Sequence, residues 1–393
     1  MDVTRSVMLL PLLAVLALPA CNAGGGGSVP AAPLERSTQA DNTDPERIAG
    51  VGRRVCPAVQ ASYARCDALI LRDATNGPAG WMPDDFQRAY NLPSSTRGAG
   101  AIVAIVDAYD NPNLASDLQT YRKEFGLGKA RFTKFNQEGQ IGNYPQPGKS
   151  WGLEEDLDVE MVSAICPKCT IYLIEANSEA PGDLEAAEAE SVMLGAQVVS
   201  NSWGCAALGC LHGSYFDSSG VVYVASAGDN GYGTQEPAAL DTVVAVGGTD
   251  LAKQGARYTE SAWRWTGSGC AHSIPKPSWQ HDGGCKSRTM SDVSAVARNV
   301  AEYDSYGYRG WFTVAGTSIS SPLIGGVFAL AGNATSLDEP EHFWMLSKKA
   351  RAKDLHDIIS GSNGTCRHRY LCKAGPGYDG PTGWGTPNGI GAF

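Results

Sequence analysis

The chain has 393 residues, 43% of them hydrophobic, and a formal net charge of −10 at pH 7. This length is sufficient for one large hydrophobic core or for two smaller domains. The acidic balance and the lack of a run of basic residues exclude the usual charge pattern of a nucleic-acid-binding protein, so no nucleic-acid partner is expected.

The N-terminus has the composition of an export signal. Arg5 precedes an apolar run over residues 8–18, which is shorter than the roughly 20 residues that span a membrane. Residues 18–21, Leu-Pro-Ala-Cys, resemble a bacterial lipobox, in which the cysteine is acylated. We therefore expect a signal over residues 1–20 and a lipid anchor at Cys21, which would make the protein an exported cell-envelope lipoprotein. The alternative is ordinary cleavage and secretion.

Ten further cysteines remain once Cys21 is set aside. An exported chain with an even number of cysteines is expected to form disulfides. A CxxC pair can also indicate a redox or zinc site, but the sequence has no second CxxC, so a structural bridge is favoured. Proximity in the sequence predicts the pairs Cys56–Cys66, Cys166–Cys169, Cys205–Cys210, Cys270–Cys285 and Cys366–Cys372.

Two parts of the chain differ in their patterns. Residues 21–85 are polar and rich in Pro and Ala, which indicates a tether and a short pro-segment or N-terminal extension. Continuous apolar runs then predict buried strands over residues 101–107, 170–176, 197–204, 221–231 and 242–249. Helical spacing predicts helices over residues 111–127 and 181–196. This alternation predicts an α/β fold with a doubly wound, mainly parallel sheet flanked by helices, and a site at the C-terminal ends of the strands.

A candidate nucleophile follows a predicted strand near the end of the chain. Residues 316–322 read Gly-Thr-Ser-Ile-Ser-Ser-Pro and lead into an apolar helix. Free backbone N–H groups and the dipole at a helix start favour a developing negative charge, so Ser318 is a candidate nucleophile. The alternative is that Thr317 or Ser318 only caps the helix.

This turn resembles the Gly-Thr-Ser-x-x-x-Pro motif that subtilisins share with sedolisins, the serine-carboxyl peptidases. Subtilisins activate the serine with a histidine in a His-Gly-Thr sequence, and none of the six histidines in this chain is followed by Gly-Thr. A serine needs a general base to attack at useful rates, so the base must come from another residue type.

Two acids four residues apart are the candidates for this role. Glu154 and Asp158 share one face of a predicted helix. The pattern alone favours an acid-rich helix N-terminus that the dipole stabilises, and Glu155, Asp156 and Glu160 fit that interpretation. The sequence Glu-x-x-Leu-Asp, however, resembles the sedolisin catalytic helix. The resemblance implies that Glu154 is the general base and that Asp158 orients it.

A third acid ends the predicted strand over residues 221–231. Ser-Ala-Gly-Asp resembles the sedolisin Ser-x-Gly-Asp, which implies that Asp229 holds the oxyanion together with the backbone N–H of Ser318. A carboxyl can donate a hydrogen bond only when it is protonated, so this role implies an acidic working pH. The alternative for Asp229 is a local turn at a strand end.

The resemblance also concerns the substrate cleft. The segment Ser202, Trp203 and Gly204 resembles the one that pairs with an extended peptide in both families. The alternative is a loop with a packed tryptophan. Asp107 ends the first predicted strand, where subtilisins carry a catalytic aspartate, and the sedolisin mechanism does not require it.

Two loops near the C-terminus resemble the sedolisin calcium site. Glycine-rich loops can aim carbonyl oxygens at a hard cation while aspartates supply charge. The resemblance implies one structural Ca²⁺ held by Asp357, Ile358, Gly375, Gly377 and Asp379. The alternative is a cluster of turns without a metal.

The resemblance extends over residues 85–393. It implies a subtilisin-like peptidase domain over residues 86–393 that acts on polypeptide substrates as an acid-acting serine-carboxyl endopeptidase through an acyl-enzyme. We expect a monomer. Sedolisins usually carry a long folded prodomain, and this chain has only a short segment in its place. Two other hypotheses are a catalytically silent peptide-binding module and a subtilisin-like enzyme that uses Asp107 with a remote histidine.

Overall fold

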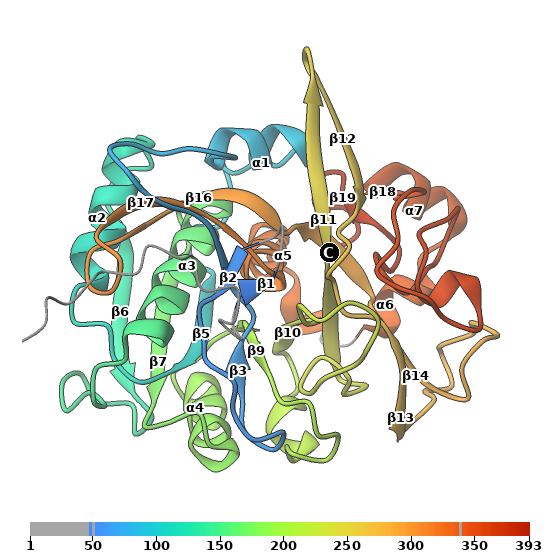
Figure 1. Ribbon diagram of the computed structural model, residues 1–393, viewed down its shortest axis with the longest axis horizontal. Coiled ribbons are helices and arrows are strands. Elements are labelled where there is room, and N and C mark those ends of the chain that lie inside the picture. Colours follow the sequence, from blue (N-terminus) through green and yellow to red (C-terminus); the bar gives the residue numbers. More distant parts are fainter. Residues whose placement is uncertain (1–46, 49–51, 338–339) are drawn as a thin grey trace, which may run out of the picture. The chain divides into compact units, whose positions relative to one another are not determined.

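The computed structural model describes residues 47–48, 52–337 and 340–393 of the chain (Figure 1). The expected export signal over residues 1–20 and the expected anchor at Cys21 lie outside these residues. Residues Asp44–Phe393 form one compact unit. In the part of the chain that is described, no helix is both long and apolar enough to cross a lipid bilayer.

The centre of this unit is a mainly parallel sheet of eight strands. The strands are β5 (Ile102–Ala108), β6 (Arg131–Asn136), β7 (Thr170–Ala176), β8 (Val198–Asn201), β10 (Val222–Ser226), β11 (Val243–Gln254), β12 (Arg257–Ala262) and β15 (Val293–Val296). Their order is β12-β11-β10-β8-β5-β7-β6, with β15 paired to β11. All pairs are parallel except β11–β12, a hairpin that projects in Figure 1. The α/β fold predicted from the sequence is confirmed.

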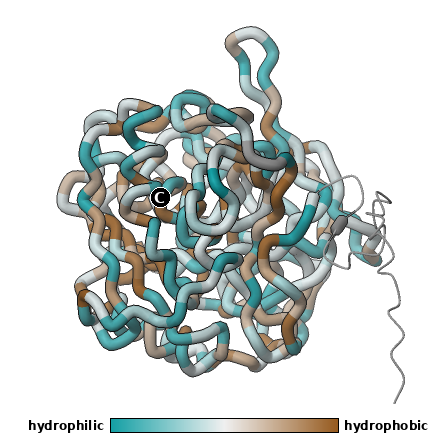
Figure 2. Tube along the Cα trace, turned by 60° about the vertical axis from the view of Figure 1, so that its left-hand side comes forward, coloured by the Kyte–Doolittle hydropathy of each residue, from teal (hydrophilic) through white to brown (hydrophobic). Residues whose placement is uncertain are grey.

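The middle strands explain the continuous apolar runs in the sequence. Every residue of β8 and β10 is buried. Strands covered on both faces lose the alternation of polar and apolar residues that marks a half-exposed strand. Figure 2 shows hydrophobic segments running through the body of the fold and hydrophilic ones at many of its outer turns.

Helices flank this sheet. The longer ones are α2 (Leu114–Glu124), α3 (Lys149–Ile165), α4 (Pro181–Met193) and α5 (Thr317–Ala331). The shorter ones are α1 (Pro83–Ala89), α6 (Glu341–Met345) and α7 (Lys348–Asp354), with 3-10 turns η1 (Gly213–Phe216), η2 (Ala334–Ser336) and η3 (Arg369–Leu371). Helices α3 and α5 pack on each other, and α5 also packs on β8 and β10, whereas α4 packs on β5 and β7. Helices α2 and α4 fall within the two predicted ranges.

A second, antiparallel sheet includes part of the N-terminal segment. Its order is β1-β2-β4-β17-β16. The strands are β1 (Arg47–Ile48), β2 (Gly52–Arg54), β4 (Leu69–Thr75), β16 (Arg298–Asp304) and β17 (Gly310–Ala315). The expected boundary between residues 85 and 86 falls inside α1, and β4 pairs with β17 of the main unit. Among the described residues the chain is therefore not divided at this point.

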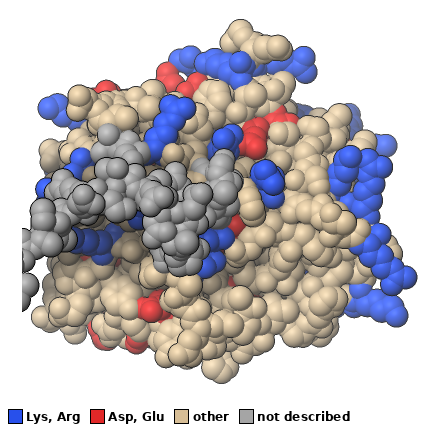
Figure 3. All heavy atoms as spheres, viewed as in Figure 1, with Lys and Arg blue, Asp and Glu red and all other residues tan. Residues whose placement is uncertain are grey.

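Many acidic side chains lie in the interior. On the face shown in Figure 3, Lys and Arg are more prominent than Asp and Glu, although acids are the more numerous in the sequence. The acids with no exposed area include Asp107, Glu154, Glu155, Asp156, Asp158, Glu160, Glu175, Glu188, Asp229, Asp292, Glu302 and Asp304. Burial penalises the charged form of a carboxyl, so this interior favours protonated acids.

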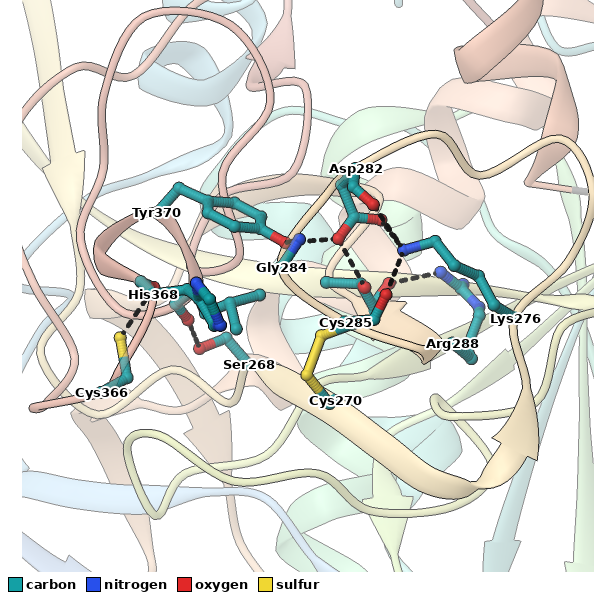
Figure 4. The surroundings of a disulfide bond; sticks show 12 residues. Ser268, Cys270, Lys276, Asp282, Gly284, Cys285, Arg288, Cys366, His368 and Tyr370 are labelled. Atoms are coloured by element: carbon teal, nitrogen blue, oxygen red, sulfur yellow. Dashed lines mark hydrogen bonds and ion pairs between the residues drawn. A yellow bond between two sulfur atoms is a disulfide. The ribbon is translucent and has the colours of Figure 1, made fainter.

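Five disulfides join the predicted pairs, and all five pairings are confirmed. Figure 4 shows the surroundings of Cys270–Cys285, which links strand β13 (Gly269–Pro275) to the segment before β14 (Ser287–Met290). In the connection, Asp282 accepts hydrogen bonds from Lys276 Nζ at 2.6 Å and from the Tyr370 hydroxyl. The remaining short strands are β3 (Arg65–Cys66), β9 (Trp203–Gly204), β18 (Leu355–His356) and β19 (Thr386–Pro387).

Candidate active site

The predicted nucleophile lies at the start of α5. Strand β17 ends at Ala315, Gly316 has φ of 140°, and α5 begins at Thr317, so Ser318 is the second residue of the helix. Only glycine fits at position 316, because a Cβ there would lie 2.0 Å from the carbonyl oxygen of Asp67. The turn thus places Ser318 among the free N–H groups of a helix start.

Glu154 and Ser318 are adjacent in the interior, and both are fully buried. Burial raises the pKa of the Glu154 carboxyl well above its usual value, the charges of Asp158 and Asp107 raise it further, and the neighbouring Ser318 hydroxyl lowers it. The Ser318 hydroxyl itself donates to the backbone carbonyl of Ser202 at 3.1 Å. Among the described residues neither Glu154 oxygen makes a hydrogen bond of normal length. The predicted base Glu154 and the predicted nucleophile Ser318 are therefore neighbours, but the Ser318 hydroxyl donates its hydrogen bond to Ser202 and not to Glu154.

Two more carboxyls adjoin this pair. Asp158 lies one helical turn after Glu154 on α3, and Asp107 lies near the end of β5. Burial raises the pKa of both well above the usual value; the charge of Asp158 adds to this at Asp107, while the Ser202 hydroxyl lowers the pKa of Asp158. Carboxyls with charges this close do not all ionise together, so they titrate as a group. Sequence analysis gave Asp107 a role only in the subtilisin-like hypothesis, and the structure places it in this group of buried acids.

Asp229 reaches the nucleophile turn from the end of β10. Its Oδ1 accepts from the N–H of Thr317 at 2.8 Å and from the Thr317 hydroxyl at 3.0 Å. Its Oδ2 has no partner in the described part of the chain, and a Cβ on Gly316 would lie 2.8 Å from it. Burial raises the pKa of Asp229 well above its usual value, and the charge of Asp67 raises it further. A protonated carboxyl here has one oxygen available to donate.

The N-terminal segment lies against Ser318 and β9. Strand β3 pairs antiparallel with β9, the segment predicted to bind an extended substrate. The N–H of Asp67 donates to the carbonyl of Ser202 at 3.0 Å. The N–H of Ser318, the predicted second oxyanion donor, donates to the carbonyl of Asp67 at 3.2 Å. The predicted binding residues Ser202, Trp203 and Gly204 therefore contact the chain itself.

Sequence analysis missed Asp67 and this contact. Strands β2 and β3, which precede Asp67, have only three and two residues, too few to show a period in the sequence. One signal was available: the predicted bond between Cys56 and Cys66 implied that this stretch is folded. That bond is present, with both cysteines buried.

The interpretation of the acid-rich sequence as a helix N-terminus is wrong. Helix α3 begins at Lys149, so Glu155, Asp156 and Glu160 lie beyond its first turn, where the effect of the dipole has fallen off. All three side chains are fully buried. Burial raises the pKa of each well above its usual value, and Asp156 and Glu160 also face buried acids of β16.

The two loops of the predicted calcium site lie together. The N–H of Gly377 donates to Asp357 Oδ2 at 2.9 Å, and the N–H of Gly375 donates to Asp379 Oδ2 at 2.9 Å. Burial raises the pKa of Asp379 to about 7, and the charge of Asp357 acts in the same direction. A buried carboxyl beside a second carboxyl fits a hard cation, which would favour the ionised form.

Comparison with known proteins agrees with this geometry. Residues 139–375, more than half of the chain, match the family model described as the subtilase family. Kumamolisin from Bacillus sp. (strain MN-32) is 26% identical over 359 residues, which cover 81% of this chain and 64% of the relative. Sedolisin from Pseudomonas sp. (strain 101) is 26% identical over 351 residues, which cover 78% of this chain and 60% of the relative. The chain thus spans less than two thirds of the length of these two relatives.

A solved structure gives the same result. The Pseudomonas sedolisin, a serine-carboxyl proteinase complexed with two molecules of pseudo-iodotyrostatin, superposes with a TM-score of 0.69 and 26% sequence identity. The match covers 80% of this chain and 96% of that one. From the family match and these relatives we conclude that the chain belongs to the subtilase family, within its sedolisin group.

Proposed function

We propose that the chain is an exported serine-carboxyl endopeptidase that hydrolyses peptide bonds at acid pH through an acyl-enzyme. The observation that carries the proposal is the contact between Ser318 and Glu154 within a group of buried carboxyls. At acid pH a histidine would already be charged, whereas one member of a carboxyl pair can still accept a proton. The serine-carboxyl chemistry named for the Pseudomonas sedolisin is extended here to this chain.

The proposed steps assign one role to each of these side chains. Ser318 Oγ attacks the carbonyl carbon of the substrate, and Glu154 takes the hydroxyl proton. Asp158 shares a proton with Glu154 and orients it. Glu154 then gives the proton to the leaving amine, and a water molecule, activated by the same carboxylate, hydrolyses the acyl-enzyme.

The negative charge on the tetrahedral intermediate needs two donors. One is the N–H of Ser318, which already donates to a peptide carbonyl, that of Asp67. The other is Asp229 through its unpaired Oδ2, provided that this carboxyl is protonated. Because burial raises the pKa of Asp229, its protonated form is present at acid pH and is lost as the pH rises through that pKa.

A pH–rate profile on a denatured protein substrate tests the proposal, with Ser318→Ala and Glu154→Gln measured beside the parent. We expect an optimum below about pH 7, at a pH where Asp229 is still protonated and the Glu154/Asp158 pair can lose a proton. Ser318→Ala should remove activity, and Glu154→Gln should lower kcat by about 10²–10⁴-fold. An optimum near neutral pH that depends on Asp107 would favour the subtilisin-like hypothesis. Peptide binding that Ser318→Ala leaves unchanged, with no hydrolysis by the parent, would favour a silent module.

We also propose one structural Ca²⁺ between the C-terminal loops. The carboxylates of Asp357 and Asp379 and the backbone carbonyls of Ile358, Gly375 and Gly377 would hold it. Removing calcium with a chelator should lower Tm by several degrees, and Asp379→Asn should lower Tm and abolish the chelator effect. Differential scanning calorimetry with and without added Ca²⁺ checks this. Equal melting curves under both conditions would contradict the calcium proposal without affecting the catalytic one.

Export and anchoring complete the proposal. They rest on the apolar run over residues 8–18 and on Cys21 in its lipobox-like context. Cys21→Ser should move the expressed protein from the membrane fraction to the soluble fraction. Recovery of both forms in the soluble fraction would leave secretion without an anchor as the explanation.

A further inference from the structure

Asp67 lies where a substrate residue would lie just before the bond to be cut. Its carbonyl accepts from the N–H of Ser318 at 3.2 Å, and its own N–H donates to Ser202 at 3.0 Å. The preceding residues of β3 pair with β9 in the manner of an added strand. The side chain of Asp67 therefore marks the pocket that receives the substrate side chain next to the scissile carbonyl.

This pocket is polar and closed. Asp67 is 1% exposed, and its Oδ2 accepts from the Ser226 hydroxyl at 2.7 Å and from Gln235 Nε2. Gln235 Nε2 also donates to the carbonyl of Ser226 at 3.1 Å, which holds the amide group in place. Ser226 is fully buried at the end of β10, and Gln235 is 7% exposed. Two buried donors thus converge on one oxygen.

Two glycines make room for the Gln235 side chain. A Cβ on Gly204 would lie 2.3 Å from its amide carbon and nitrogen, and a Cβ on Gly228 would lie 2.8 Å from its Oε1. Gly228 also has φ of 106°, which favours glycine. Of these two glycines, Gly204 belongs to β9, the strand that pairs with β3.

We propose that Ser226 and Gln235 determine the specificity of the peptidase and select a short carboxyl or amide side chain, Asp or Asn, on the residue whose carbonyl is attacked. The proposal rests on the proposed function and adds the substrate class. An aliphatic side chain would leave the Ser226 hydroxyl and one N–H of the Gln235 amide without their present acceptor, and a lysine would bring a further donor with a charge. Discrimination against both should reach at least about tenfold in kcat/KM.

The first experiment uses the chain itself and needs no activity. All variants carry Ser318→Ala to prevent cleavage. Asp67→Asn should have a Tm close to that of Ser318→Ala alone, because the amide oxygen of Asn can accept the hydrogen bonds from Ser226 and Gln235. Asp67→Leu should lower Tm by about 2–5 °C, and adding Gln235→Leu to it should restore part of the loss. Equal Tm values for the Asn and Leu variants, or a further loss in the double variant, would overturn the proposal.

The second experiment maps cleavage. Wild-type protein is incubated at acid pH with peptides from a denatured proteome, and new termini are identified by mass spectrometry. Asp and Asn should precede the cut bonds, and Gln235→Leu should shift the preference to Leu. Gln119→Leu, on an exposed position of α2, is the matched control and should leave the preference unchanged.

The outcomes separate the two proposals. A preference for apolar or basic residues that Gln235→Leu does not alter would overturn the specificity assignment while the peptidase stands. If no cleavage depends on Ser318, the proposed function fails. The Tm values of the Asp67 variants then still show whether Ser226 and Gln235 favour a carboxyl or amide group at this position. If Asp67→Leu does not fold, the cleavage map decides alone.

Discussion

At Ser318 the two donors of the residue have different acceptors. Its N–H donates to Asp67 and its hydroxyl donates to the carbonyl of Ser202, while the neighbouring Glu154 carboxyl accepts neither. A substrate in place of Asp67 would keep the first bond. In the proposed mechanism the Ser318 hydroxyl must turn from the Ser202 carbonyl to Glu154 before it attacks.

Asp229 allows the oxyanion role to be tested at the level of one atom. Asp229→Asn supplies an N–H donor that does not titrate, so activity should persist and its falling limb should move to higher pH. Asp229→Ala removes the donor and should lower kcat by about 10²–10³-fold. Steady-state pH–rate profiles of both variants check this. Profiles that fall at the same pH in the parent and in Asp229→Asn would argue against a protonated Asp229 in the reaction.

At the scale of an element, α3 carries acids on several faces, all of them buried. Glu154 neighbours Ser318 and Asp158 neighbours Ser202, while Asp156 and Glu160 face the acids of β16. The helix is thus a structural element whose folded environment favours protonated carboxyls. The same burial that raises the pKa values in the site also links the stability of the fold to pH.

The buried acids of α3 should make the free energy of unfolding of the protein fall as the pH rises. The pKa values of Asp156 and Glu160 are raised in the folded state above 3.8 and 4.5, so below about pH 4 both states are protonated. Above that pH the unfolded state loses its protons first, and the free energy of unfolding decreases. Calorimetry should show Tm falling from about pH 4 to pH 7, and Glu160→Gln should flatten this slope. A Tm that rises with pH would contradict this account.

At the scale of the whole molecule, the N-terminal segment and the catalytic unit form one fold. Strand β4 pairs with β17 in the second sheet, and β3 pairs with β9 in the cleft. The disulfide Cys56–Cys66 joins two cysteines that both precede Asp67. If the chain were cut after Asp67, this disulfide would not link β3 to the residues that follow the cut. Among the described residues, β3 would then be held to the rest of the unit by non-covalent contacts alone.

Self-cleavage should occur at this bond, because the Asp67 carbonyl already contacts the N–H of Ser318. On incubation at acid pH the wild-type chain should acquire Ala68 as a new N-terminus, and Ser318→Ala should stay intact. N-terminal sequencing over time, at several protein concentrations, distinguishes cleavage within one molecule from cleavage between molecules. A new N-terminus elsewhere would show that Asp67 does not lie at the reacting position.

Local patterns in the sequence were sufficient for several features. The buried strands, the helices and the turn at Ser318 follow from short periodic or small-residue segments. The five disulfides join cysteines 3 to 15 residues apart, so proximity alone predicted them. Glu154 and Asp158 needed the family resemblance, because the same spacing equally fits an ordinary acidic helix.

The sequence by itself therefore determined the fold class, the strand–turn–helix at Ser318 and the disulfides, which depend on residues close together in the chain. Only the tertiary structure decided that Asp67 lies against Ser318, that Ser226 and Gln235 hold its side chain, and that the acids of α3 are buried. These contacts join segments more than a hundred residues apart, and the burial of a carboxyl depends on what packs around it, which no local pattern records.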